Sequence, residues 1–269
     1  MPGTAMLAWL TRWRRRRVVR RKPLDAALWQ QTLAGLPLLA GLEMDQKREL
    51  EYLTTLFLHD KSFEPVQGLV LTDADRYWIA AQACLPILGL GLEWYDGWRG
   101  IVIYPYDFVG GHAEIDDAGV VHEHDMLQTG ESWQHGPVIL SLPEVRNSGH
   151  CDGNNVIIHE LAHKLDMLNG DANGYPPLHR NMPSEIWSRV FQAAYDDLGE
   201  RVDSRIRVSI DAYATESPAE CFAVFSEYFF SLPGLLQAEY PQVYEQLALF
   251  YRQQPLQRLQ SAARSSASD

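Results

Sequence analysis

The feature that most constrains this chain is a pentapeptide of the form His-Glu-x-x-His, which begins at His159 and ends at His163. Residues four apart lie on one face of an α-helix, so both imidazoles can reach a single metal ion. Glu160 follows the first histidine directly, where its carboxylate can contact a water molecule on that metal. The motif therefore requires a helix over residues 156–168 and predicts a zinc site on it.

The residues around the motif provide the apolar stripe and the boundaries of such a helix. Ile158, Leu161, Leu165 and Leu168 recur at spacings of three and four, which predicts a face directed at a hydrophobic core. The histidines fall on a different stripe of the same helix. The candidate N-cap residues are Asp152, Asn154 and Asn155, and the pair Asn169-Gly170 is typical of a helix end.

A hydrolytic zinc site needs a third protein ligand and an open fourth position. The metzincin arrangement is excluded because positions 166 and 169 are Asp and Asn rather than Gly and His, and no Asn-Glu-x-x-x-Glu segment of the thermolysin type follows. The best candidate is Glu220, in the first turn of a predicted helix with Ser217 as N-cap and Pro218 at its first position. The following residues are mostly apolar, so this carboxylate favours a cation as its partner.

Three other acidic residues near these segments have open roles. Glu227 lies seven residues after Glu220, and either orients a ligand histidine or is solvated. Glu216 is a weaker candidate ligand because it precedes the predicted helix. Asp166 is a candidate for supporting a ligand through a hydrogen bond.

Hydrophobic patterning divides the chain into helical, mixed and again helical stretches. We expect helices over 25–100, short strands over 100–145 and the zinc-binding helices over 150–255. Together these predict an α+β fold: one mostly helical domain over 25–255 with a small mixed or antiparallel sheet. A hairpin turn is predicted at 116–119. A strand over 137–141 begins with a proline, which favours either a sheet edge or a strand terminus. We expect the last residues, 256–269, to fray.

Charge is distributed unevenly along the chain. The net charge is −12, but residues 1–24 contain eight basic residues and no acidic one. The remainder carries 15 basic and 35 acidic residues, which excludes a generic nucleic-acid-binding body. We expect residues 1–24 to form a disordered, solvated arm, and the alternative is that this basic arm contacts an anionic surface.

Other features of the sequence favour a cytoplasmic protein. No apolar run reaches the length of a membrane span, and the arm lacks the basic-then-apolar order of a secretory signal. The cysteines Cys84, Cys151 and Cys221 are odd in number and widely spaced, which indicates reduced thiols. His122 and His124 can face one side of a strand as a second metal site, but we favour the simpler interpretation that they belong to a polar outer face.

Several segments resemble the Mlc titration factor A family of bacteria. They begin at His159 (His-Glu-Leu-Ala-His-Lys-Leu-Asp-Met), at Asp211 (Asp-Ala-Tyr-Ala) and at Ala219 (Ala-Glu-Cys-Phe-Ala-Val-Phe-Ser-Glu-Tyr-Phe-Phe). Gly-Pro-Val-Ile-Leu-Ser at 136–141 and Asn-Gly-Asp at 169–171 also fit the family, and the resemblance runs over about 25–255. It implies a zincin-like, gluzincin-type peptidase core similar to that of anthrax lethal factor.

The resemblance also implies roles for individual residues. His159, His163 and Glu220 are expected to hold one Zn²⁺ per chain, with Glu160 as catalytic base. Tyr213 lies seven residues before Glu220. Its hydroxyl is expected to donate a hydrogen bond to the transition state.

The resemblance implies two possible functions, and the metal motif by itself allows a third. The first is a peptidase, aminopeptidase-like, that hydrolyses short peptides. The second is an anti-repressor that binds and titrates Mlc, the repressor of glucose phosphotransferase genes, with or without cutting. The third is a purely structural role, in which the bound zinc only stabilises the fold.

Overall fold

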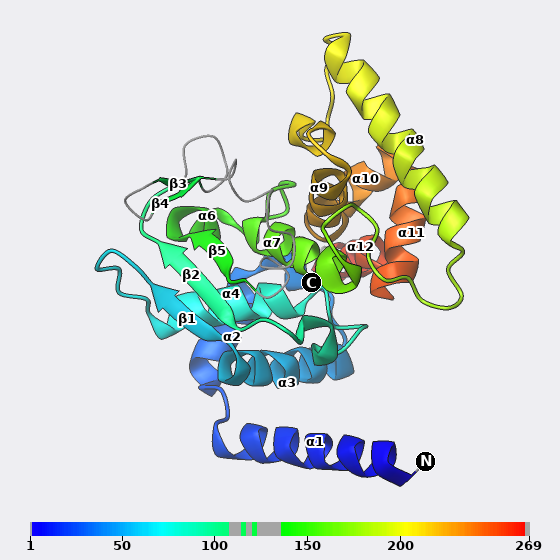
Figure 1. Cartoon of the computed structure of the whole chain (residues 1–269). Coiled ribbons are helices and arrows are strands. Elements are labelled where there is room, and N and C mark those ends of the chain that lie inside the picture. Colours follow the sequence, from blue (N-terminus) through cyan, green and yellow to red (C-terminus); the bar gives the residue numbers. More distant parts are fainter. Residues whose placement is uncertain (1, 108–113, 117–119, 123–135, 267–269) are drawn as a thin grey trace.

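The computed structural model describes residues 2–107, 114–116, 120–122 and 136–266. Helices make up most of the molecule, and a small sheet lies beside them (Figure 1). The first helices are α1 (Pro2–Arg21), α2 (Ala26–Gly35), α3 (Met44–Asp60) and α4 (Asp73–Cys84). The later helices are α6 (Leu142–Asn147), α7 (Val156–Asp166), α8 (Ser184–Asp203), α9 (Pro218–Ser231), α10 (Pro233–Glu239), α11 (Pro241–Tyr251) and α12 (Pro255–Ser266). Short 3₁₀ turns are η1 (Pro37–Leu39), η2 (Leu92–Tyr95), η4 (Met167–Asn169) and η5 (Ala212–Thr215).

The sheet has three parallel strands in the order β1-β2-β5. These are β1 (Ser62–Pro65), β2 (Gly100–Tyr104) and β5 (Val138–Ser141). The register pairs Phe63 with Ile101, and Ile101 with Val138. In the described part of the chain β5 is an edge strand, as the proline before it predicts.

A separate antiparallel pair consists of β3 (Glu114–Asp116) and β4 (Val120–His122), which supports the predicted hairpin. Its turn residues 117–119 lie outside the described residues, and so does His124. The fold is thus α+β with both parallel and antiparallel pairing. The sequence does not predict β1, because a run of only four residues that ends in a proline is too short to identify as a strand.

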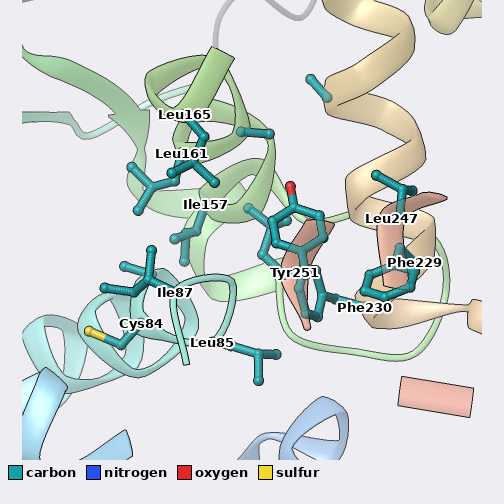
Figure 2. Close-up of a cluster of buried hydrophobic side chains, with 14 of the residues drawn as sticks. Cys84, Leu85, Ile87, Ile157, Leu161, Leu165, Phe229, Phe230, Leu247 and Tyr251 are labelled. Carbon is teal, nitrogen blue, oxygen red and sulfur yellow. The ribbon is translucent and has the colours of Figure 1, made fainter. Parts of the chain in front are cut away.

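The core joins helices from both halves of the chain. Figure 2 shows Cys84, the last residue of α4, and Ile87 just after it on the side of Ile157 and Leu161 of α7. Of the predicted stripe, Ile158, Leu161 and Leu165 are buried in the core and Leu168 packs against it. On its other side α7 packs against α9, and that pair has the most extensive contact between any two described helices. The predicted stripe of α7 is therefore confirmed as a core face. One cluster of buried side chains extends from Trp29 to Tyr251.

Aromatic rings fill the space between α8, α9 and α11. Trp187 of α8 stacks on Phe191 with 4.3 Å between ring centroids, and Phe222 of α9 packs edge-on against Phe250 of α11 at 5.9 Å. Such packing makes α9 a rigid support for the acidic residues on its other face.

The N-terminal arm is a helix and not the disordered tail that the sequence analysis expected. Val18 and Val19 of α1 pack against the core, and Nη1 of Arg15 lies 3.4 Å from Oε2 of Glu93. The high density of basic residues, with no acidic one, led to the wrong expectation. Within this basic segment, Val18, Val19 and Arg15 share one face of the helix, and that face contacts the rest of the protein.

The C-terminal segment is also more ordered than expected, since α12 extends to Ser266. Arg258 anchors it by donating from Nη1 to the carbonyls of Leu38 and Ala40, at 2.7 and 2.6 Å. A contact across 220 positions of sequence has no local signal. All three cysteines are free thiols. No helix among the described residues has the length and apolarity to cross a bilayer.

Candidate metal centre

The local sequence fixes both ends of α7. Oδ1 of Asn155 accepts a hydrogen bond from the backbone N–H of Ile158 at 3.0 Å, so Asn155 is the N-cap among the three candidates. The α-helix ends at Asp166, and the 3₁₀ turn η4 continues to Asn169. Gly170 then takes a positive φ of 143°, which allows the chain to leave the helix as predicted.

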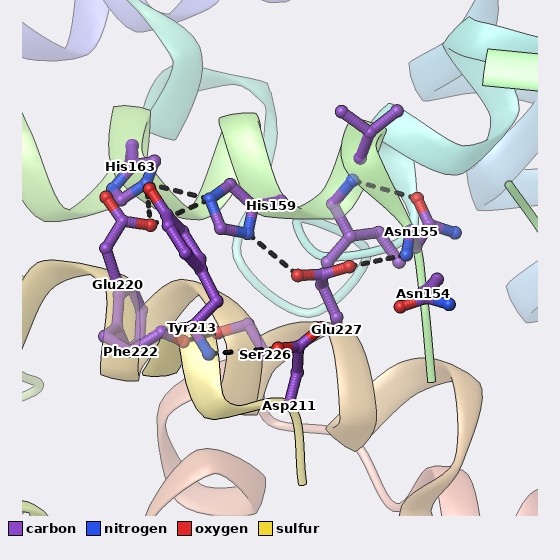
Figure 3. A network of polar contacts seen from close by, with 12 residues as sticks. Asn154, Asn155, His159, His163, Asp211, Tyr213, Glu220, Phe222, Ser226 and Glu227 are labelled. Atoms are coloured by element: carbon purple, nitrogen blue, oxygen red, sulfur yellow. Dashed lines mark hydrogen bonds and ion pairs between the residues drawn. The ribbon is translucent and has the colours of Figure 1, made fainter. Parts of the chain in front are cut away.

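Helix α9 presents Glu220 to α7. Oγ of Ser217 caps the helix by accepting from the backbone N–H of Glu220 at 3.2 Å, and Pro218 occupies its first position. Glu220 therefore lies in the first turn. Its side chain points toward the two histidines across the α7–α9 contact (Figure 3).

The two histidines and Glu220 form a close triangle of ligand atoms. Oε2 of Glu220 lies 3.0 Å from Nε2 of His159 and 3.3 Å from Nε2 of His163. The two Nε2 atoms are 3.2 Å apart. Within the described ranges, these three side chains are the only group of His, Cys, Asp or Glu placed to hold a metal ion.

The triangle fits a zinc ion in both size and chemistry. Ligand atoms about 2.0–2.1 Å from a tetrahedral zinc are about 3.3 Å from one another, which is close to the observed edges. Two imidazole nitrogens and one carboxylate oxygen are a common catalytic zinc donor set, and three protein ligands leave a fourth position open. Without a cation, their lone pairs would face one another in a nearly buried site.

Glu227 orients the first histidine. Its Oε1 lies 2.8 Å from Nδ1 of His159, and its Oε2 accepts a hydrogen bond of 2.5 Å from the backbone N–H of Asn155. A carboxylate at Nδ1 favours the tautomer with hydrogen on Nδ1, which leaves the Nε2 lone pair directed at Glu220. Of the two roles considered for Glu227, the structure supports the orienting one.

Gln82 extends this network into α4, and the sequence analysis missed it. Its Oε1 accepts from Nδ2 of Asn155 at 2.8 Å, so Asn155 contacts Gln82, Glu227 and its own helix at once. Gln82 is fully buried within the apolar part of α4. A single polar residue in an apolar helix face could have suggested a buried partner, but nothing in the sequence identifies Asn155 as that partner.

Three titratable groups at the centre, two carboxyl groups and one imidazole, differ in the direction of their pKa shifts. Burial alone would raise the pKa of Glu220, but the two histidines hold it well below its ordinary value. Burial raises the pKa of Glu160, only partly offset by His159 and His163. Burial would lower the pKa of His159, whereas Glu220 and Glu227 raise it well above the usual value. The site is thus a compact set of opposed charges.

Tyr213 lies beside the triangle on η5. Its ring centroid is 6.1 Å from that of His159, and Figure 3 shows the ring extending toward the two histidines. Oδ1 of Asp211 caps η5 by accepting from the backbone N–H of Tyr213 at 2.9 Å. The hydroxyl of Tyr195 also ties η5 to α8 by donating to the carbonyl of Thr215. Glu216, the weaker candidate ligand, is exposed and outside the triangle.

Asp166 supports a loop rather than a ligand side chain. Its Oδ2 accepts from the backbone N–H groups of Asn173 and Gly174 at 2.7 and 2.6 Å. Gly174 has a φ of 75°, and a Cβ there would lie 2.4 Å from the carbonyl oxygen of Pro218. The loop after α7 therefore packs directly against the first residue of α9, two positions before Glu220.

Lys164 connects the motif helix to the strand region. Its Nζ donates to the carbonyl of Gly136 at 2.9 Å, just before β5, and burial lowers its pKa to about 8. The edge strand is thus held against the helix that carries the two histidines.

Comparison with known proteins agrees with this geometry. The chain matches the family described as glucose-regulated metallo-peptidase M90 over residues 10–252. A protein of Cronobacter sakazakii named Mlc titration factor A is 43% identical over 243 residues, covering 90% of this chain and 91% of that protein.

Relatives of the same name from two other bacteria are similarly close. The Klebsiella pneumoniae protein is 42% identical over 86% of this chain and 88% of its own length. The protein of Escherichia coli strain 55989 is 43% identical over 87% of this chain and 89% of its own. The match covers both helices that form the centre, and the chain therefore belongs to the glucose-regulated metallo-peptidase M90 family.

Proposed function

We propose that this protein is a zinc-dependent peptidase that hydrolyses short peptides in the cytoplasm. The observation that carries the proposal is the triangle of His159, His163 and Glu220, with Glu160 beside it on the same helix. In the proposal these three residues hold one zinc ion. When bound, zinc lowers the pKa of a water ligand toward about 7 and polarises the carbonyl of a substrate.

The residues of the chain supply the proton transfers and the positioning. Glu160 accepts a proton from the attacking water and delivers it to the leaving amine. The hydroxyl of Tyr213 donates a hydrogen bond to the oxyanion that develops on the peptide carbonyl. Glu227 keeps His159 in the tautomer that binds a metal through Nε2.

The edge strand β5 provides a place for an extended peptide. Its outer edge is unpaired in the described part of the chain, and Lys164 holds the segment before it against α7. A substrate backbone could pair there as an additional strand. Val138→Pro removes a backbone donor from β5, and an unchanged KM in that variant would contradict this mode of binding.

The variant Glu160→Gln tests the hydrolytic proposal. We expect kcat to fall at least a hundredfold while zinc content stays unchanged, because the amide cannot accept the proton. The control is Glu216→Gln, which changes an exposed carboxylate outside the triangle and should retain full activity. Full activity of Glu160→Gln would contradict the role of this residue.

The resemblance to its family suggests that the enzyme acts from the amino end of a peptide. Peptide pairs that differ only in acetylation of the amino terminus test this directly. An aminopeptidase cleaves only the free form, whereas equal cleavage of both forms would show endopeptidase action.

A second candidate function is binding of the repressor Mlc, which the name of the relatives favours. The two functions separate in the same variant. Glu160→Gln should keep its affinity for purified Mlc if binding is independent of catalysis. A wild-type protein that binds zinc and Mlc but cleaves no peptide in a diverse library would favour the anti-repressor function over the peptidase.

A further inference from the structure

One face of α1 combines aromatic and basic side chains. At 100° per residue, Trp9, Trp13, Arg16, Arg17 and Arg20 fall within an arc of about 100° on this helix. Trp9 and Trp13 are 58% and 48% exposed, large values for tryptophan, and the three arginines are also exposed. We call these five residues the Trp–Arg face.

The opposite side of α1 attaches the helix to the protein. Val18 and Val19 pack against the core, and Arg15 forms an ion pair with Glu93. These three side chains lie roughly opposite the Trp–Arg face around the helix. Figure 1 shows α1 on the outside of α3, so the Trp–Arg face is directed away from the body of the protein.

Ion pairs within the described residues leave most of the positive charge of this helix without a partner. In the part of the chain that the structure describes, the ion pair of Arg15 is the only one that α1 makes. The body beyond residue 24 carries a net charge of −20, so it would be repelled by an anionic surface. An anionic surface would therefore attract α1 and orient the rest of the molecule away from itself.

We propose that α1 binds the surface of an anionic phospholipid bilayer through the Trp–Arg face. The arginines pair with the lipid phosphates. The indoles of Trp9 and Trp13 insert at the boundary between the headgroups and the acyl chains. The guanidinium of Arg17 lies 5.4 Å from the ring centroid of Trp13, so charge and ring already form one unit.

The geometry favours a bilayer over a nucleic acid. A duplex offers phosphates, but its bases are stacked and give two adjacent exposed indoles no apolar surface to enter. A bilayer offers phosphates and apolar boundary at neighbouring depths. The helix lies on the surface and does not cross it, because α1 is not apolar enough to span.

Sedimentation of the full chain with vesicles tests the proposal. Vesicles of phosphatidylcholine mixed with phosphatidylglycerol are compared with vesicles of phosphatidylcholine alone. We expect binding to the anionic vesicles only, weakened by salt, and reduced between tenfold and about a hundredfold in Arg16→Ala/Arg17→Ala/Arg20→Ala. Binding to the anionic vesicles should shift the tryptophan fluorescence of the wild type to the blue. Trp9→Ala/Trp13→Ala should weaken binding and remove that shift.

The matched control is Arg180→Ala/Arg189→Ala/Arg207→Ala, which removes the same charge from exposed positions elsewhere. It should bind the vesicles within twofold of the wild type. An equal loss in this control would contradict the proposal by showing a dependence on net charge alone. Absence of vesicle binding by the wild type, or tighter binding to a DNA duplex that the tryptophan variant does not weaken, would also overturn it. Circular dichroism confirms that each variant is folded.

Discussion

Oε1 of Glu227 lies 2.8 Å from Nδ1 of His159, so a carboxylate from α9 orients a histidine of α7. The same helix carries Glu220, whose Oε2 lies 3.0 Å from Nε2 of that histidine. His159 is therefore held between two carboxylates seven residues apart, one at each ring nitrogen. This relationship makes the packing of α7 on α9 the element that assembles the centre.

The contact between Glu227 and His159 predicts the effect of Glu227→Gln. The amide is a weaker acceptor for the Nδ1 hydrogen, although it can still accept from the backbone of Asn155. We expect zinc affinity to fall by about 10–100-fold with little loss of stability. Competition with a chelating dye measures the affinity. Glu200→Gln on the exposed side of α8 is the control, and equal affinity in both variants would contradict the orienting role.

The close approach of Gly174 to Pro218 predicts the effect of Gly174→Ala. A methyl group would meet the carbonyl oxygen of Pro218 at 2.4 Å, in addition to the strain of a φ of 75°. We expect a loss of about 2–4 kcal/mol in the free energy of unfolding. Zinc affinity should also fall, because a shift of Pro218 moves Glu220.

Gly68→Ala is the matched control for that variant. Gly68 has a nearly equal φ of 78°, but no atom lies within 4 Å of the added carbon. Its cost should be about 1 kcal/mol, from backbone strain alone, with unchanged zinc affinity. Urea unfolding measures the free energy of unfolding of both variants. An equal loss in Gly174→Ala and Gly68→Ala would contradict the role of the contact with Pro218.

The buried amine of Lys61 predicts a pH dependence of stability. Nζ donates to the carbonyls of Tyr95 and Trp98 at 2.6 and 2.7 Å, and burial lowers the pKa of Lys61 to about 8. The pKa in the unfolded chain is about 10.4, so between pH 8 and 10.4 the unfolded state binds more protons. The free energy of unfolding from this group should therefore rise over that range, by about 3 kcal/mol at most.

Lys61→Met isolates that contribution because it keeps the apolar stem and removes the titrating group. The variant should be less stable at pH 7, since two buried carbonyls lose their donor. The difference between the wild-type and variant free energies of unfolding should widen from pH 8 to 10.4. Tyrosines that titrate in the same range cancel in that difference. If the free energies of unfolding of the wild type and the variant changed in parallel with pH, the amine of Lys61 would not titrate in this range.

The sequence alone predicts the centre well because its signals are local. Asn155 and Ser217 cap their helices through residues three positions away, and the apolar stripe of α7 follows a fixed period. The position of Glu220 in the first turn of its helix follows from Ser217 and Pro218. These short-range rules place the three candidate ligands on their helices without knowledge of the tertiary fold.

What the sequence does not predict depends on contacts between distant residues. Gln82 meets Asn155 across 73 positions, and Arg258 reaches Leu38 across 220. The helix α1 is held in place because Val18 and Val19 pack against the core. The pattern of arginines around these valines does not predict that contact. Strand β1 forms because β2 offers a partner, since its own four residues have little preference for a strand.

The most direct test of the metal centre is zinc content by mass spectrometry together with peptide hydrolysis in the same samples. The samples are the wild type, His163→Ala, Glu220→Ala and the exposed control Glu216→Ala. We predict one zinc per chain in the wild type and the control, and loss of both zinc and hydrolysis in the two ligand variants. Full retention of zinc in folded Glu220→Ala would contradict the account, because the triangle would then not be the metal site.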